Sequence, residues 1–169
     1  MDVQNACYGG GYLESAEVFA RRIACPAQCS LVLEVQGHVA AYLAAYRSVQ
    51  GKITRLHGDF ETVDTPDTLY LHDLAVRPEL AGQGAAALLL HSLWQDAIGR
   101  GLHRSALVAV QGSQGFWQRH GYATYALQDP SQRERLAAYG RDAVYMMRRL
   151  DAPAPDDGPA RLTPRAPLP

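Results

Sequence analysis

The segment that runs from an apolar strand into a glycine-containing turn carries the clearest chemical signal in the sequence. Leu-Ala-Val at residues 74–76 is followed by Gly-Gln-Gly at 82–84 and three alanines at 85–87. Small residues let a ligand approach the backbone, and the first amides of a helix lack intrahelical acceptors and lie at the positive end of its dipole. The spacing therefore predicts an anion site, although it has neither the G-x-G-x-x-G of a dinucleotide fold nor the Gly-Lys-Ser/Thr of a P-loop.

A histidine lies on the strand that precedes this turn. His72 comes two residues before Leu74, and an imidazole titrates near neutral pH, so it can accept a proton from an amine. In a regular strand His72 shares a face with Tyr70, Leu74 and Val76, whereas Asp73 lies on the other face. We predict His72 as a candidate base, with a purely structural histidine as the alternative. Asp73 is predicted to be a structural acceptor or a partner of the site, and a bulge would reverse the faces.

Helix-like and strand-like segments alternate around these residues. Apolar spacing predicts helices over 14–24, 84–98, 113–119 and 131–138, and strands over 31–35, 39–46, 68–76, 106–110, 122–127 and 143–150. The first two strands form a hairpin around Gln-Gly-His, and a polar loop spans 47–67. Strands that alternate with helices indicate an α+β or α/β domain with a central sheet.

The composition separates one domain from a terminal segment. Six of the ten prolines lie in residues 151–169, whose only large apolar side chains are Leu162 and Leu168. Such a segment buries too little apolar surface to offset its ordering entropy. We therefore predict a single domain over 1–150 and a proline-rich, disordered tail over 151–169, in a monomer or a homodimer.

Charge, hydropathy and cysteine content argue against several classes of binding partner. The net charge is −1, so no global basic field favours nucleic acid or an anionic membrane. No apolar run approaches the roughly 20 residues of a membrane helix, and the first residues do not resemble a signal peptide, so we expect a cytoplasmic protein. Cys25 and Cys29 lack a second zinc-like pair, so we expect no metal site.

Three linked segments between residues 68 and 122 form a specific combination. The strand LHDLAV is followed by RPELAGQGAA, the apolar strand ALVAV comes next, and GFWQRHGY completes the set. The first resembles the pyrophosphate motif [Arg/Gln]-x-x-Gly-x-[Gly/Ala] of the GNAT superfamily of acyl-CoA-dependent N-acyltransferases. The last is similar to that family's Phe-Tyr-x-x-x-Gly-Phe signature. With the preceding helix and hairpin, the resemblance covers nearly all of residues 1–150.

The resemblance implies a GNAT-like α+β fold, in which helices flank a mixed, mostly antiparallel sheet that splays between the strand of His72 and the strand of Val108. It implies acetyl-CoA as the acetyl donor. The backbone of 74–76 would pair with the pantetheine arm, residues 82–87 would bind the pyrophosphate, and two aromatic residues would contact the arm and the thioester. The cofactor-binding residues so implied are Leu74, Ala75, Val76, Gly82, Gln83, Gly84, Ala85, Ala86, Ala87, Phe116 and Trp117. A histidine at the place of His72 belongs to the base relay of the arylalkylamine N-acetyltransferase branch.

Two residues depart from the family pattern. Ala81 stands where Arg or Gln is usual, which leaves only backbone amides for the pyrophosphate. Trp117 stands where many members carry the tyrosine that protonates the leaving thiolate, and an indole N–H is no acid at pH 7. We therefore assign the thiolate acid to Tyr145 in the last strand. Gln111 or Ser113 replaces a common asparagine that contacts the arm of the cofactor.

Two further features concern the acceptor. The stretch 56–73 has five carboxylates and no Lys or Arg, so it is either a solvated loop or a negative rim that attracts a cationic amine. The segment 8–12, Tyr-Gly-Gly-Gly-Tyr, is a candidate lining of the acceptor entrance. We predict an N-acetyltransferase that moves an acetyl group to a small primary amine by direct attack. The alternatives are an acyl-CoA-binding regulatory or scaffold domain, and an enzyme that acts on protein N-termini or lysines.

Overall fold

The computed structural model describes residues 1–8 and 13–151. The tail predicted from residue 151 onward lies outside the described residues apart from Asp151. The same holds for the glycines of the predicted 8–12 entrance segment.

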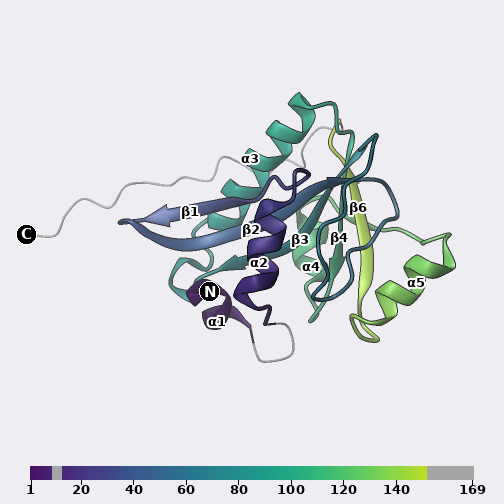
Figure 1. Ribbon diagram of the computed structural model, residues 1–169. Coiled ribbons are helices and arrows are strands. Elements are labelled where there is room, and N and C mark those ends of the chain that lie inside the picture. The colour runs from purple at the N-terminus through teal and green to yellow at the C-terminus, as the bar shows by residue number, and fades with distance from the viewer. Residues whose placement is uncertain (9–12, 152–169) are drawn as a thin grey trace, which may run out of the picture.

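A six-stranded sheet forms the centre of the protein (Figure 1). Its strands are β1 (Leu31–Val35), β2 (His38–Ser48), β3 (Thr68–Val76), β4 (Arg104–Ala109), β6 (Val144–Arg149) and β5 (Ala123–Thr124), in that spatial order. All neighbours are antiparallel except β3 and β4. The predicted α+β fold with a mixed, mostly antiparallel sheet is confirmed, although β5 is shorter than the predicted strand over 122–127.

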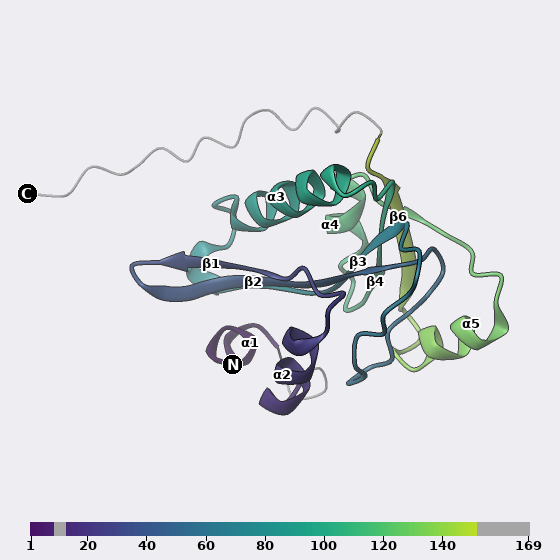
Figure 2. The ribbon, with the colours of Figure 1, turned by 45° about the horizontal axis from the view of Figure 1, so that its top comes forward.

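Helices cover both faces of the sheet (Figure 2). On one face lie α3 (Ala85–Gly99) and α4 (Gln114–Arg119), and on the other lie α1 (Asp2–Cys7) and α2 (Ala16–Ala24). The helix α5 (Pro130–Ala137) lies at the β6 end, and a 3₁₀ turn η1 (Pro78–Leu80) follows β3. Ser15 caps α2 by accepting a hydrogen bond from the Val18 amide. The sequence analysis did not predict α1.

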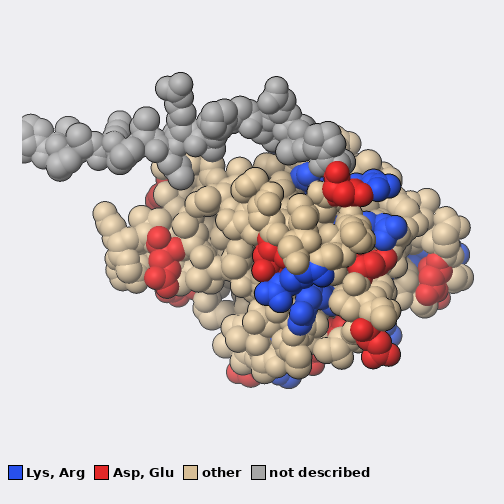
Figure 3. All heavy atoms as spheres, turned by 90° about the horizontal axis from the view of Figure 1, so that it is seen from above, with Lys and Arg blue, Asp and Glu red and all other residues tan. Residues whose placement is uncertain are grey.

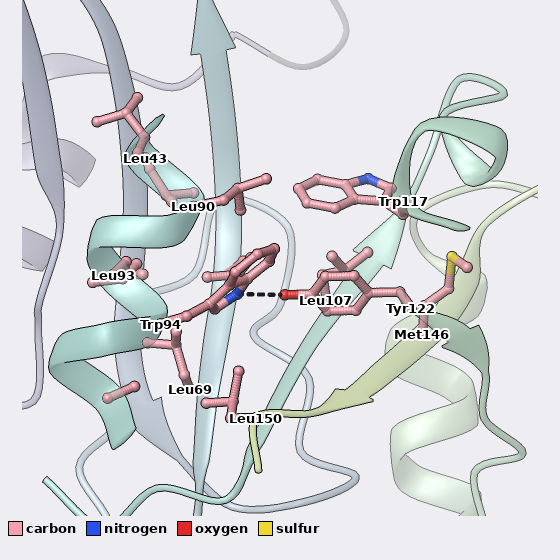
Figure 4. Packing of buried hydrophobic residues seen from close by; sticks show 14 of the residues in the cluster. Leu43, Leu69, Leu90, Leu93, Trp94, Leu107, Trp117, Tyr122, Met146 and Leu150 are labelled. Atoms are coloured by element: carbon pink, nitrogen blue, oxygen red, sulfur yellow. Dashed lines mark hydrogen bonds between the residues drawn. The ribbon is translucent and has the colours of Figure 1, made fainter. Parts of the chain in front are cut away.

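The core between α3 and the sheet anchors the helix whose first turn faces the site. Leucines at the spacing of one helix face, with Trp94, pack against β-strand side chains (Figure 4). The Trp94 indole donates to the Tyr122 hydroxyl at 3.2 Å, and that hydroxyl lies 2.6 Å from the Ser105 Oγ. Burying one leucine contributes roughly 1.5–3 kcal/mol, so this interface fixes the position of α3 firmly.

The strand β3 is not regular, and this corrects one prediction. In the β2–β3 ladder Leu71 pairs with Ala45 and Asp73 with Ala44, so His72 is an extra residue, which is the signature of a bulge. After the bulge Leu74 packs with the α3 cluster, whereas His72 and Asp73 both contact side chains on the α2 face. The prediction that Leu74 and Val76 share a face with His72 is therefore wrong.

The surface charges are mixed. On the face shown in Figure 3, acidic and basic side chains are interspersed, and neither sign covers the face. None of the helices in the described part of the chain is long and apolar enough to cross a membrane.

Candidate functional site

A cleft of about 560 Å³ opens where β3 and β4 separate. The two strands pair in parallel only from Thr68 to Leu71 on β3 and from Arg104 to Leu107 on β4. Beyond Leu71, no strand among residues 1–8 and 13–151 pairs with β3 on its β4 side. The lining comes from β3, from the turn and first residues of α3, from β4 and from α4.

The glycine turn and the start of α3 form one wall of the cleft. Gly82 and Gly84 have φ angles of 73° and 85°, in the left-handed region that glycine adopts without strain. Gly84 begins α3 with no side-chain cap, so the first amides of a 15-residue helix stay available. Residues 84–87 all line the cleft, which suits an anion at the positive end of the helix.

Nine of the eleven residues predicted to bind the cofactor line this cleft. The other two are Ala75, which is buried, and Gln83, whose side-chain amide donates to the Glu79 carbonyl at 2.6 Å. Phe116 and Trp117 form an apolar wall, with their rings 4.9 Å apart at an angle of 81°. Gln111 and Ser113 line the cleft as well.

The helix α1 reaches the free edge of β3. The Tyr8 hydroxyl lies 3.0 Å from the Leu74 carbonyl, and the Cys7 thiol donates to the Val76 carbonyl at 3.1 Å. These carbonyls belong to the stretch predicted to pair with the cofactor's arm. A carbonyl oxygen has two lone pairs, so each can accept a second hydrogen bond.

The bulge presents His72 to an ionised pair on the α2 face. His72 lines the cleft, and its Nε2 lies 3.5 Å from Oε1 of Glu14. Glu14 is itself held by a two-point ion pair with the buried Arg22, one of whose hydrogen bonds is 2.6 Å long. Arg22 also donates to the Gly58 carbonyl, at 2.7 Å and 2.9 Å. Phe60 packs against His72, with ring centroids 5.7 Å apart.

The charge of Glu14 fixes the tautomer of His72. Burial alone would raise the pKa of Glu14, but the hydrogen bonds from His72 and Arg22 outweigh burial and hold it at about 2. An ionised Glu14 can only accept a hydrogen bond, so Nε2 carries the hydrogen in this contact, and in the neutral imidazole the lone pair is then on Nδ1. That Nδ1 is buried and has no hydrogen-bond partner among the described residues.

Asp73 lines the same cleft beside His72 but has different partners. The Tyr8 hydroxyl donates to its Oδ1 at 2.5 Å, and the Tyr42 hydroxyl donates to its Oδ2. Burial, followed by the Asp73 charge, raises the pKa of both phenols. Both therefore remain protonated donors at neutral pH.

The structure does not bring Tyr145 to the cleft. Its ring is 1% exposed in a second cluster with Tyr46 and Tyr70. Its hydroxyl accepts a hydrogen bond from the Gly51 amide at 3.0 Å, and burial raises its pKa. This position does not favour the role of thiolate acid.

The predicted acidic rim is mostly engaged in ion pairs. Asp59 pairs with Arg21, Asp67 pairs with Arg104, and Glu61 pairs with Lys52 and Arg135. Of the five carboxylates in the stretch 56–73, Asp73 is the one that the described cleft lining contains. Among residues 1–8 and 13–151, no group of three or more His, Cys, Asp or Glu side chains is placed to hold a metal ion.

The comparison with known protein families agrees with this geometry. The model of the acetyltransferase (GNAT) family matches residues 1–122. The chain belongs to the GNAT family. No curated protein matches it.

Solved structures with the same fold have different activities. The ribosomal-protein-S18-alanine N-acetyltransferase from Escherichia coli is 18% identical with a TM-score of 0.63, and the match covers 90% of this GNAT chain and 86% of that one. GphF, a GNAT-like decarboxylase in complex with isobutyryl-CoA, is 17% identical with a TM-score of 0.68, over 88% and 92%. At these identities the likeness shows the fold alone.

A third neighbour was solved with coenzyme A and N-acetyl-glutamate. It is the N-acetylglutamate synthase from Neisseria gonorrhoeae, with 21% identity and a TM-score of 0.61. The match covers 83% of this GNAT chain but only 29% of that protein, so this chain spans less than a third of its length.

Sequence reasoning missed the residues that hold His72 and Asp73. Glu14 lies 58 positions before His72, and Tyr42 lies 31 positions before Asp73. The sequence places Glu14 only at the start of the helix predicted over 14–24, which carries no sign of its contact with His72. Tyr8 was predicted near the acceptor entrance, but its bond with Asp73 was not.

Proposed function

We propose that this GNAT protein transfers an acetyl group from acetyl-CoA to a primary amine of a small molecule, by direct attack of the amine in a ternary complex. The observation that carries the proposal is the position of His72. It lines the same cleft as the uncapped start of α3, with Nε2 directed to an ionised Glu14 and Nδ1 unpartnered among the described residues. A neutral imidazole held in this tautomer is a proton acceptor.

The α3 side of the cleft, hereafter the donor side, has the features that acetyl-CoA requires. The first amides of α3 and the two left-handed glycines suit a pyrophosphate, and no side chain of the helix competes for these amides. Phe116 and Trp117 supply apolar surface for the arm. When bound, acetyl-CoA supplies the activated acyl group.

The side of the cleft lined by Tyr8, His72 and Asp73, hereafter the acceptor side, has the groups that deprotonate an amine. An alkylamine is mostly protonated at neutral pH and must lose a proton before it attacks a thioester. Glu14 orients His72, and the lone pair on Nδ1 takes the proton. Because the His72 side chain is 4% exposed and its Nδ1 is buried, we expect the ring to shift when the amine binds, so that the amine or one water molecule can reach Nδ1.

Direct attack needs no nucleophile from the protein. Burial, the largest influence on Cys7, raises the pKa of its thiol, so the thiol stays protonated and is a poor nucleophile. Tyr8 is the single phenol in the described lining, and it already donates to Asp73. An ordinary thiol has a pKa of roughly 8.5, so its thiolate can leave and take a proton from water.

The release of free thiol from acetyl-CoA with a panel of primary amines tests the proposal. We expect amine-dependent release together with one acetylated amine for each thiol. Stoichiometric binding of acetyl-CoA with no release over the amine panel would instead support a regulatory or scaffold domain. Release with peptides but not with small amines would support an enzyme that acts on protein N-termini or lysines.

A further inference from the structure

Asp73 is a carboxylate in the cleft without a counterion. It lines the cleft, and both of its oxygens accept from phenols, Tyr8 on one and Tyr42 on the other. Among the residues that the structure describes, no Lys, Arg or His forms an ion pair with it. The two phenols are neutral donors, so they orient the carboxylate but leave its charge uncompensated.

Two other acidic groups, one beside His72 and one just before β3, differ from Asp73 because each has a counterion. Glu14 has Arg22, and Asp67 has Arg104 at 2.9 Å. A carboxylate removed from bulk water is costly unless a cation or several donors compensate it. A ligand that brings a positive charge into the cleft would supply what Asp73 lacks.

The charge that Asp73 receives is best carried by a group other than the reacting amine. A carboxylate beside an ammonium stabilises the protonated form and raises its pKa, which opposes the deprotonation that attack requires. The two adjacent side chains also have separate partners. His72 contacts Glu14 and Phe60, whereas Asp73 contacts Tyr8 and Tyr42. The bulge thus places a proton acceptor and a fixed negative charge side by side.

We propose that Asp73, held by Tyr8 and Tyr42, binds a second cationic group of the acceptor, so that the preferred acceptors are diamines or amines with another positive charge. This inference rests on the proposed N-acetyltransferase function and adds a substrate class to it. Tyr8 places the carboxylate at the free edge of β3, because the same hydroxyl lies 3.0 Å from the Leu74 carbonyl. The second charge is therefore bound close to the strand that faces the donor.

Matched pairs of acceptors test the inference. Diaminobutane and diaminopentane are compared with aminobutanol and aminopentanol, in which a hydroxyl replaces one amino group. We expect kcat/KM to be about 10- to 100-fold higher for each diamine, which is the effect of one hydrogen bond between charged groups. Asp73→Asn should reduce the ratio to about one by lowering the rate with the diamines.

Two control variants distinguish a direct contact with Asp73 from a general effect of negative charge in the acidic stretch 56–73. Asp64→Asn removes an exposed carboxylate from the same acidic stretch, outside the cleft lining, and should keep the diamine preference. Tyr42→Phe removes one donor to Asp73 and should give an intermediate ratio. Equal kcat/KM for diamine and amino alcohol, or a diamine preference that survives Asp73→Asn, would overturn the inference.

A binding measurement keeps this test separate from the proposed function. If none of these amines releases thiol, the direct-transfer proposal fails for them, and calorimetry with diaminobutane then decides the inference alone. Binding to the wild-type protein in the presence of CoA, reduced about 10-fold or more by Asp73→Asn, supports the site. Absence of binding, or equal affinity for both proteins, contradicts it.

Discussion

The donor side of the cleft presents glycines, alanines and helix amides, whereas the acceptor side presents two polar side chains, His72 and Asp73, that partners from other segments hold in place. On the donor side Gly82, Gly84 and the first turn of α3 come from one short stretch of chain. On the acceptor side the bulge in β3 presents His72 and Asp73, and their partners Glu14 and Tyr42 come from distant segments. The two sides should therefore respond to different substitutions. Added bulk or charge should weaken CoA binding on the donor side, whereas the loss of one polar partner should impair the acceptor side.

Replacing His72 should cause the largest loss of activity without weakening the binding of CoA on the donor side. His72→Ala removes the proton acceptor, and general-base help is worth about 10²- to 10⁴-fold in rate. We expect kcat to fall within that range, while calorimetry gives an unchanged Kd for CoA, because His72 is not part of the α3 turn. A CoA affinity that falls as much as kcat would show that the two sides do not act separately.

A negative charge introduced on the donor side should weaken the binding of CoA and leave the acceptor side intact. Ala86→Glu places a carboxylate in the first turn of α3, where the helix dipole favours it, so the fold should be retained. The negative charge opposes an anion in the cradle, and we expect CoA to bind about 10- to 100-fold more weakly. Ala86→Gln, of similar size but neutral, is the control and should bind CoA several-fold more tightly than Ala86→Glu. Equal affinity of the two variants would mean that no anion lies at this turn.

The ion pair of Glu14 and Arg22 on the acceptor side should make the stability of the protein depend on pH. The pKa of Glu14 is about 2 in the folded protein against an ordinary 4.5. This group therefore contributes stability above about pH 4.5, and the contribution is lost as the pH falls toward 2. At about 1.4 kcal/mol per pH unit the contribution is about 3 kcal/mol. Glu14→Gln should lower the free energy of unfolding by about this amount at neutral pH.

Denaturant unfolding of both proteins across this pH range checks the expectation. The difference between wild type and Glu14→Gln should shrink as the pH falls from about 4.5. A difference that stays constant down to pH 2 would show that Glu14 is not held ionised by His72 and Arg22.

The donor side could be predicted from the sequence because its determinants are local. Apolar spacing over residues 84–98 defines the buried face of α3, and the glycines before it mark the turn. The predicted sheet and its separation between β3 and β4 follow from the same short-range patterns and from the family resemblance.

His72 and Asp73 could be named from the sequence, but the groups that hold them could not be predicted, because these depend on register and on long-range contacts. The bulge at His72 arises from the pairing of β2 with β3, and alternation along one strand does not reveal an extra residue. The bonds from Glu14 to His72 and from Tyr42 to Asp73 join separate elements. The helix α1 has six residues and no strong apolar period, so its contacts with β3 were also not foreseen.

The pH dependence of kcat/KM for one primary amine, measured for the wild type and for His72→Ala, tests the central claim most directly. If His72 accepts the proton, the wild-type protein should keep a high kcat/KM at pH values where little of the amine is free, because the base removes the proton there. The variant should be slow at those pH values, and its kcat/KM should rise only with the fraction of free amine. Profiles of the same shape and height for both proteins would contradict the assignment of His72 as the base.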